Sequence, residues 1–429
     1  MKKSAVIYTV FTLNRNMIKN KIIYNSFSEY QFKISKAKDS YIWDENGKKL
    51  IDFTSGWNVV NLGWNNKEVN DAIVKQAKKN IYTSMWLADP IQEEYAEKLT
   101  LSLPKSLTII TREVSGVTAN IMAIKTARAY TGKRKILSFR DTFHGSLYQT
   151  LQLGYSPEYP ISKAIFLDFK DHIQLKYPRV NFEDKNEKQI LIDFLFEFEK
   201  ILKSDKEIGA FITESGIITG WGSTFIAPKG YLTEVRKLTK KYGVLLILDE
   251  VGTGFSRTGK LYGMNHENVI PDIVTFAKGI GNGATIAATV TTQEIAQKTF
   301  DKSNPQSTFG WSPLNVAGAL KTLEIHQPNK VWEKAEKDGN YIMKALRTEL
   351  KNISYVEDIN GLGMEIGVRL ANGLKNFNMI KFIEKARNKR LHLANADSYS
   401  FQIMPPLTIE RSILDKGLEI FINEVKSFS

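Results

Sequence analysis

The chain contains no cysteine among its 429 residues. This absence excludes disulfides, cysteine nucleophiles and cysteine-ligated metal sites, and it is typical of a protein from a reducing cytoplasm. Histidine is scarce as well, with five residues, and no histidine and carboxylate pair stands at the spacing of a zinc motif. We therefore expect no metal site and a cytoplasmic location.

Long apolar runs are also missing. No segment offers the roughly 20 apolar residues that are needed to cross a bilayer. The first residues, MKKSAVIYTVFTL, resemble the start of a signal peptide, but Asn14, Arg15 and Asn16 interrupt the apolar run and no small-residue cleavage pattern follows. The sequence therefore predicts neither a membrane span nor a secretion signal.

The balance of charges is basic, with 59 Lys and Arg against 46 Asp and Glu and a net charge of +13. A basic surface can attract nucleic acid, anionic membrane or acidic substrates. Here the charges are spread along the chain without a long run, and no nucleic-acid recognition motif accompanies them. We interpret the excess as a solvated, lysine-rich surface and expect neither nucleic acid nor a membrane as a partner.

The pattern of elements predicts three segments in this length of chain. Residues 1–70 contain YIWDENGKKLIDF, which predicts two strands joined by an Asn-Gly turn. Residues 71–324 alternate short apolar strands with amphipathic helices, which favours a mostly parallel sheet with helices on both faces. Residues 325–429 turn to long helices, and we expect them to form a smaller α+β domain with the N-terminal segment. The predicted strands are 135–139, 209–213, 244–248, 273–276 and 284–291; the predicted helices are 71–80, 91–103, 331–350 and 413–428, with a strand pair around 361–370.

Polar or reactive side chains follow four of these strands. They are Glu214, Asp249, Lys278 and the pair Phe143-His144. In open α/β sheets ligands bind beyond the carboxyl ends of the strands, so we expect these side chains to meet at one edge. Each one alone has a plainer interpretation, such as a helix cap, a solvated lysine or simple packing, and it is their joint placement that favours a functional site.

Lys278 is the candidate for covalent chemistry. A lysine amine with its free pKa of about 10.4 is protonated and is no nucleophile. Burial among apolar groups lowers that pKa, which suits Schiff-base formation. The glycines of GIGNG after this lysine allow the backbone to approach a ligand closely.

The stretch SGVTAN, residues 115–120, precedes the helical pattern IMAIKTARAYTGK. A turn of small residues that opens a helix directs free N–H groups and the positive end of the helix dipole outward. This turn is therefore a candidate site for a phosphate group.

Taken together, these stretches resemble the class III aminotransferases, a branch of the fold type I enzymes that use pyridoxal 5′-phosphate (PLP). The most specific similarity is LLILDEVGTGFSRTGKLYG at 245–263, followed by PDIVTFAKGIGNG at 271–283. Further similar stretches are SGVTAN, DTFHGS, TESGIITGWG, STFGWSPLNVAGA and GLGMEIGV. The resemblance implies an α/β fold of the aspartate-aminotransferase-like type, PLP as cofactor, and transfer of an amino group from an amino donor to a carbonyl acceptor.

The resemblance also implies roles for single residues around the PLP ring. Lys278 would hold PLP as a Schiff base and shuttle a proton, and Asp249 would pair with the pyridine nitrogen. Phe143 and Val251 would cover the two faces of the ring. His144 belongs with Phe143 to the predicted cofactor site, and Glu214 would lie near the ring hydroxyl.

Other implied roles concern the phosphate, the substrate and a second subunit. Ser115, Gly116 and Val117 would surround the phosphate, the last two through backbone N–H groups. Thr308 would reach the phosphate of the neighbouring subunit, because active sites in the family lie at a dimer interface, so a homodimer with shared sites is expected. The predicted substrate pocket consists of Trp57, Tyr82, Trp86 and Gln402.

Three departures from the family pattern affect this prediction. In the phosphate turn, Val117 and Thr118 stand where the family usually has a hydroxyl residue and an acid, so a side-chain bond to the phosphate is lost unless Thr118 replaces it. Gln402 stands three residues before Pro405, where many members have an arginine that grips a substrate carboxylate. Arg369 or Arg411 could compensate. Trp64 and Trp311 add aromatic bulk, which indicates either packing or a reshaped pocket.

The sequence favours a transaminase with a specialised biosynthetic substrate, such as an amine, an ω-amino compound or a carbonyl on a larger, even peptidic, molecule. An aminomutase or amino-acid epimerase on the same fold is the nearest alternative, since neither needs a second substrate. An inactive binding protein on a PLP fold is the alternative from another class. Lys278, Asp249 and the Phe143-His144 pair favour an enzyme over that last alternative.

Overall fold

The computed structural model describes residues 32–182, 186–220, 224–371, 373–375, 377–395, 397 and 399–427. The N-terminal residues considered above for a secretion signal lie outside these ranges. Within them, none of the helices has the length and apolar character that a bilayer span requires. The same ranges contain no group of three or more His, Asp or Glu side chains arranged to hold a metal ion.

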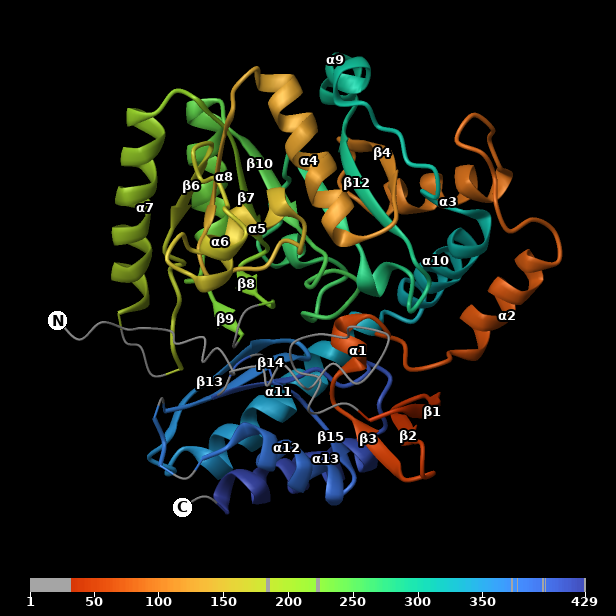
Figure 1. Cartoon of the computed structure of the whole chain (residues 1–429), viewed down its shortest axis with the longest axis vertical. Helices are drawn as coiled ribbons and strands as arrows, with labels where there is room; N and C mark the ends of the chain where they lie inside the picture. The colour runs from red at the N-terminus through yellow and green to blue at the C-terminus, as the bar shows by residue number, and fades with distance from the viewer. Residues whose placement is uncertain are drawn as a thin grey trace.

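A seven-stranded sheet forms the centre of the larger part of the molecule (Figure 1). Its strand order is β4 (Leu107–Glu113), β12 (Ala287–Thr292), β11 (Ile273–Phe276), β10 (Leu245–Asp249), β7 (Ile208–Glu214), β5 (Lys135–Phe139) and β6 (His172–Leu175). The pairings from β11 to β6 are parallel, and β12 runs antiparallel to both of its neighbours. Every residue of β7 and β10 is buried, as expected for central strands that are covered on both faces.

Helices cover this sheet. They are α3 (Pro90–Leu101), α4 (Gly116–Thr131), α5 (Tyr148–Gly154), α6 (Pro160–Ala164), α7 (Glu187–Ser204), α8 (Tyr231–Tyr242), α9 (Gln293–Ser303) and α10 (Pro313–His326). Helix α2 (Lys67–Ala77) packs on α10 instead, and its buried Val69 belongs to the core of the smaller part. One core contains the aromatic rings of Phe139, Phe198 and Phe211 together with Tyr231. A second apolar cluster joins α4 to β5, β7, β10 and β11 and fixes the position of this helix on the sheet.

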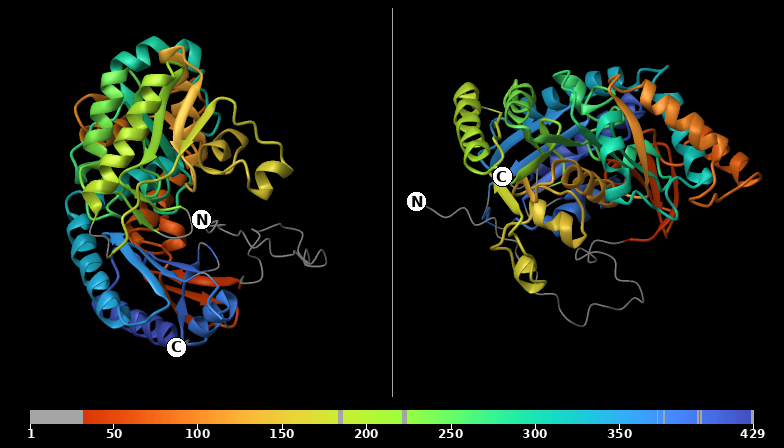
Figure 2. Two further views of the ribbon diagram at one scale, coloured as in Figure 1. Left: turned by 90° about the vertical axis from the view of Figure 1, so that its left-hand side faces the viewer. Right: turned by 90° about the horizontal axis from the view of Figure 1, so that it is seen from above.

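The smaller part of the molecule lies below the large one in Figure 2 (left) and combines both ends of the described chain. One sheet has the order β1 (Ile34–Lys38), β2 (Tyr41–Asp44), β3 (Lys49–Asp52) and β15 (Leu391–His392); the other has the order β13 (Val356–Leu362), β14 (Glu365–Leu370), β17 (Ser400–Ile403) and β16 (Ala394–Asn395). Its helices are α11 (Val331–Leu350), α12 (Met379–Asn388) and α13 (Arg411–Lys426). Short elements at the junction of the two parts are α1 (Ser55–Asn58), β8 (Ile217–Ile218), β9 (Phe225–Ile226), η3 (Gly263–His266) and η4 (Lys278–Ile280).

The observed elements agree closely with the predicted α/β pattern. The strands at 135–139 and 273–276 and the helix at 331–350 have their predicted bounds. The first helix begins earlier than predicted, at Lys67, because the Asn66 side chain caps it by accepting hydrogen bonds from two backbone N–H groups. The predicted strand at 284–291 begins at Ala287, because a turn between Gly281 and Ala284 precedes it. On the two separate cores we propose domain boundaries near residues 70 and 324.

Candidate functional site

Lys278 lies just beyond β11, at the start of the single 3₁₀ turn η4. Its backbone is in the left-handed region, with φ of 49°, which is a strained conformation for a residue with a side chain. Burial lowers the pKa of its amine. The charges of Glu214, Glu365 and Asp249, in decreasing order, act against that shift. The amine therefore lies where it can lose its proton, which nucleophilic chemistry requires.

Asp249 ends the neighbouring strand β10 and is 2% exposed. Its Oδ2 lies 2.7 Å from Nδ1 of His144 and accepts a hydrogen bond of 2.7 Å from the Asn120 amide. Its Oδ1 accepts the backbone N–H of Val251 at 3.0 Å. These contacts on both oxygens hold the carboxylate in one orientation at the sheet edge.

Glu214 ends β7 and pairs in register with Asp249. Burial and then the charge of Asp249 raise its pKa well above the ordinary value. Thr219 donates to Glu214 through both its backbone N–H and its hydroxyl. Burial beside a second carboxylate thus favours the protonated form of Glu214.

The turn before α4 has the geometry of an anion site. Ser115 is the N-cap, and the Thr118 hydroxyl donates to the Ser115 carbonyl at 2.9 Å in a capping box. Thr118 is thus occupied in the cap and does not replace the missing hydroxyl of residue 117. The backbone N–H groups of Gly116 and Val117 make no recorded hydrogen bond within the described ranges, so they are the donors open to a phosphate.

Gly116 and Val251 bring this turn close to Lys278. A Cβ atom at Gly116 would lie 2.9 Å from Cγ1 of Val251, so only glycine fits here. Val251 also packs against a small cluster that contains Ala277, the residue before the lysine. Phe143 is 40% exposed and contacts Gly220 closely enough that a Cβ there would lie 2.9 Å from its own Cβ.

Arg257 is a residue of this region whose role the sequence did not reveal. It is completely buried, and burial lowers its pKa to about 10. Its guanidinium donates to the carbonyls of Met364 and Pro405, to the Ser55 hydroxyl and to the Asn61 amide oxygen. The arginine therefore joins the loop after β10 to the smaller part of the molecule. Its place inside the stretch at 245–263 was the only signal for it in the sequence.

Gln402 and Glu365 approach the site from the smaller part of the molecule. Both side chains are 0% exposed. Nε2 of Gln402 donates to the Thr219 carbonyl at 2.6 Å and to Glu365 at 3.4 Å. Asn58 donates to the other oxygen of Glu365 at 2.5 Å. Burial raises the pKa of Glu365 to about 7.

Comparison with known proteins identifies the family. The family model described as Aminotransferase class-III matches residues 23–425. The chain belongs to the class III aminotransferases. An acetylornithine aminotransferase of Archaeoglobus fulgidus is 28% identical over 403 residues, covering 94% of this chain and 98% of the relative. The corresponding enzyme of Methanothermobacter thermautotrophicus is 30% identical over 408 residues, covering 94% and 96%.

Solved structures agree with the family. An (S)-enantioselective omega-transaminase from Thermomicrobium roseum has a TM-score of 0.84 and 28% identity, covering 95% of this chain and 96% of its own. A Bacillus anthracis aminotransferase has a TM-score of 0.86 and 26% identity, covering 96% of both chains. The predicted fold type I architecture, the PLP cofactor and the transaminase activity are confirmed for this class III aminotransferase.

The residues at the sheet edge fit PLP on chemical grounds. A protonated pyridine nitrogen needs a fixed anion, and the Asp249 carboxylate is held by three donors. A phosphate needs N–H donors, and those of Gly116 and Val117 have no other recorded acceptor in the described part of the chain. Asn120, which holds Asp249 and accepts from Thr275 at 2.7 Å, is a further supporting residue that the sequence left unassigned.

Not every predicted site residue of this aminotransferase lies beside Lys278 in the single chain. Trp57 is half-buried in the left-handed turn α1. Tyr82 and Trp86 are exposed by 41% and 84%, and Thr308 is exposed as well. The ring of Tyr82 packs instead against the exposed Phe309, with a centroid distance of 5.8 Å.

The arginines that could replace the missing family arginine are engaged elsewhere. Arg369 pairs with Glu357 at 3.1 Å, and Arg411 pairs with Asp338 at 2.5 Å. Neither of them acts on Lys278, whose recorded charged neighbours include only one arginine, Arg257. The compensation considered from the sequence stays a prediction, and in this chain both arginines are paired with carboxylates.

The two unusual tryptophans belong to the packed interior rather than to a reshaped pocket. Trp311 is 1% exposed, donates to the Ala287 carbonyl at 2.7 Å and packs against the tilted ring of Tyr95, with a centroid distance of 4.9 Å. Trp64 donates to Asp52 at 2.7 Å and lies under Gly56, where a Cβ would be 3.3 Å from its ring.

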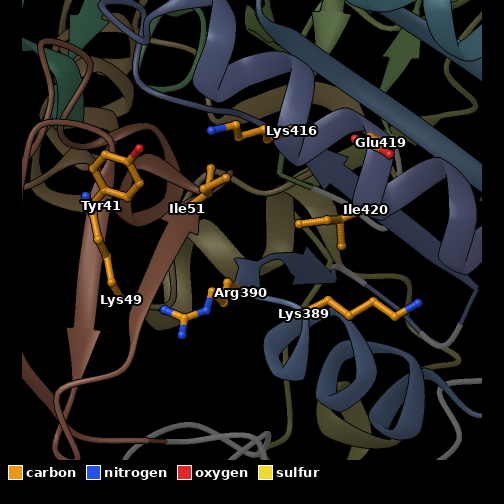
Figure 3. A pocket seen from close by; sticks show the side chains of 8 residues that line it. All are labelled: Tyr41, Lys49, Ile51, Lys389, Arg390, Lys416, Glu419 and Ile420. Atoms are coloured by element: carbon orange, nitrogen blue, oxygen red, sulfur yellow. The ribbon is translucent and has the colours of Figure 1, made fainter.

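A pocket of about 300 Å³ lies elsewhere, between the β1–β3 sheet and α13 of the smaller part (Figure 3). It is lined by Tyr41, Lys49, Ile51, Lys389, Arg390, Lys416, Glu419 and Ile420. Lys49 lies 3.5 Å above the centre of the Tyr41 ring, and Lys389 is paired with Glu424. Two of its cations are thus already engaged, and the pocket has no lining residue in common with the Lys278 site.

Proposed function

We propose that this transaminase acts on the terminal amino group, or on the corresponding terminal aldehyde, of a biosynthetic compound, and that Lys278 is the residue that attaches PLP as a Schiff base. The observation that carries the proposal is the position of the Lys278 amine, in a strained turn beside the buried Asp249–His144 pair. Relatives named as acetylornithine aminotransferase and as aminoadipate semialdehyde/glutamate semialdehyde transaminase support a substrate of this kind.

When bound, PLP would supply the electron sink for the negative charge that forms at the carbon bearing the amino group. Asp249 would hold the ring nitrogen in its protonated state, with His144 and Asn120 keeping the carboxylate ionised and oriented. Glu214, with its raised pKa, would donate a hydrogen bond at the hydroxyl side of the ring. When it is not attached to PLP, the Lys278 amine would take the proton from the substrate carbon. It would return a proton to carbon in the later half of the transfer.

The phosphate of PLP would rest on the start of α4. Gly116 and Val117 would each donate a backbone N–H, while Ser115 shapes the turn from its N-cap position. Phe143 and Val251 would cover the faces of the ring. Because no side-chain hydroxyl is free at residues 117 and 118, we expect the phosphate to depend on the backbone donors more than in relatives with the usual turn.

We further propose a homodimer in which Thr308 reaches the phosphate in the partner's site. The support is an exposed group of large apolar residues beside it, which a monomer would leave in water: Ile81, Tyr82, Trp86, Leu87 and Phe309. In such a dimer Tyr82 and Trp86 would line the substrate pocket of the other subunit. Trp57 would line the substrate pocket of its own subunit. The absence of cysteine supports the proposed cytoplasmic location.

The test is an absorbance spectrum of the purified protein with added PLP. We expect a band at the visible edge that is lost in Lys278→Ala and retained in the matched control Lys260→Ala, which changes an exposed lysine paired with Glu336. Adding an amino donor with a terminal amine should bleach this band and release a carbonyl product. A band that survives in Lys278→Ala would show that another group holds the cofactor, and the assignment of the lysine would be abandoned.

A further inference from the structure

Glu365 is a buried carboxylate that the reaction assigned above does not use. It is the first residue of β14, and its side chain is 0% exposed where the smaller part meets the large one. Among the charged side chains that act on Lys278, its effect is larger than that of Asp249. The carboxylate therefore lies near enough to the Lys278 amine for its charge to act on it.

No cation of the described chain neutralises Glu365 by direct contact. The ion pairs recorded for the described residues do not include it, although its charge interacts with Arg257 and Lys278 at longer range. Nη1 and Nη2 of Arg257 donate to two carbonyls, a hydroxyl and an amide oxygen, and its buried Nε has no hydrogen-bond partner among the described residues, so none of its nitrogens bonds to Glu365. A buried carboxylate without a cation is costly, so this one either takes up a proton or awaits a positively charged ligand.

The amide groups around Glu365 leave further acceptors without partners. Gln402 is oriented by the Thr219 carbonyl, which can only accept, so its nitrogen faces Thr219 and Glu365. The Asn58 nitrogen likewise faces the carboxylate. The oxygens Gln402 Oε1 and Asn58 Oδ1 are both buried, and neither has a hydrogen-bond partner among the residues that the structure describes.

The Glu365 carboxylate and the two amide oxygens are all hydrogen-bond acceptors, so a ligand that binds them must carry hydrogen-bond donors. Each amide oxygen shares a carbon with a nitrogen that donates to Glu365, so both amide oxygens lie within a few ångströms of its carboxylate. A primary ammonium group carries three N–H donors and one positive charge, which matches this set. A substrate carboxylate would instead meet a negative charge and would find the amide nitrogens already used.

We propose that Glu365, with Asn58 and Gln402, forms a subsite for a second ammonium group, so that the preferred amino donor is a diamine or another amine with a cationic far end. This inference rests on the proposed function, because it describes the substrate of the same Lys278 site. Glu365 is the specificity-determining residue, and Asn58 and Gln402 position it and complete the set of acceptors.

A matched series of amines tests the subsite on the PLP-loaded dimer. Putrescine, n-butylamine and γ-aminobutyrate have the same carbon chain and reacting amine, and their far ends are an ammonium, a methyl group and a carboxylate. Binding is read from the change in PLP absorbance at equilibrium, without turnover of a second substrate. We expect putrescine to bind about tenfold to a hundredfold more tightly than n-butylamine. Hydrogen bonds to a charged group typically strengthen binding by that factor relative to a ligand that makes none. γ-Aminobutyrate should bind the most weakly.

Variants assign the preference to the subsite. Glu365→Gln should make putrescine and n-butylamine bind equally, while Glu357→Gln, an exposed carboxylate on β13, should leave the wild-type ratio unchanged. Gln402→Arg places a cation beside Glu365 and should shift the preference from putrescine toward γ-aminobutyrate, which keeps the test decisive if Glu365→Gln does not fold.

The outcomes separate the two proposals. If no amine alters the spectrum of the wild-type protein, the proposed transaminase substrate class has failed. If the amines react but n-butylamine binds as tightly as putrescine, or if Glu365→Gln retains the preference, the ammonium subsite alone is overturned.

Discussion

The burial of Glu365 makes a prediction about stability that does not depend on catalysis. Its pKa is raised from an ordinary 4.5 to about 7, chiefly because it is removed from water, while Arg257, Asn58, Lys278 and Thr224 partly oppose the shift. At 1.36 kcal/mol for each pKa unit, this difference corresponds to a penalty of up to about 3 kcal/mol for the ionised form in the folded state.

The sign of the pH dependence follows from the raised pKa. Below pH 4.5 the folded and unfolded chains both hold the proton, and the penalty is absent. Between 4.5 and about 7 the unfolded chain has lost a proton that the folded chain keeps, so the free energy of unfolding falls as the pH rises. Above about 7 both states are ionised and the folded protein bears the full penalty.

Glu365→Gln removes this titration. Any hydrogen bond that the substitution changes affects stability equally at all pH values, so it cancels when two pH values are compared. Relative to the wild type, the variant should gain up to about 3 kcal/mol of unfolding free energy between about pH 5 and about pH 8. Denaturant unfolding of the PLP-free protein measures this gain, and Glu357→Gln is the exposed control. An identical stability difference at both pH values would refute the argument that Glu365 is buried without a cation.

Other substitutions test the remaining parts of the site. Arg257→Met leaves two carbonyls and an amide oxygen without their donor, and it should lower the free energy of unfolding by about 3–5 kcal/mol in denaturant unfolding. The control Lys260→Met in the same loop should lower it by less than about 1 kcal/mol. Equal effects of the two substitutions would contradict the bridging role of Arg257. Gly116→Ala places a Cβ against Val251 and should weaken PLP binding roughly tenfold, and Val251→Ala in the same chain should restore it, so a failure of this rescue would sink the steric explanation. Phe309→Glu should convert the dimer to monomers in light scattering and lower the PLP content, and an unchanged mass would remove the basis for the proposed interface.

Much of the architecture could be predicted because it depends on local patterns. The strands at 135–139 and 273–276 are short apolar runs bounded by polar residues, and they form as predicted because both faces of the sheet are covered. Lys278 and Asp249 could be placed at one edge because parallel strands bring their carboxyl ends together. These inferences use neighbours in the chain and one rule of topology.

The supporting residues could not be predicted in this way. Asn120 bonds to Asp249 across 129 positions of sequence, and Asn58 bonds to Glu365 across 307. No periodicity or turn signal encodes such a pair, since its partners meet only when elements far apart in the sequence pack together. For the same reason the sequence could not show that Arg369 pairs with Glu357 and Arg411 with Asp338 in the smaller part.

The sequence by itself determined the class of fold, the family and the cofactor, and it singled out Lys278 as the lysine to test, because strand patterns and the stretch at 245–283 are local and specific. Only the tertiary structure decided what surrounds that lysine. Packing brings the buried carboxylate of Glu365 near the Lys278 amine, together with two amide oxygens that have no donor among the described residues. Burial gives these groups their effect, because a charge or a polar atom that water would satisfy must find its partner in the protein or in the substrate.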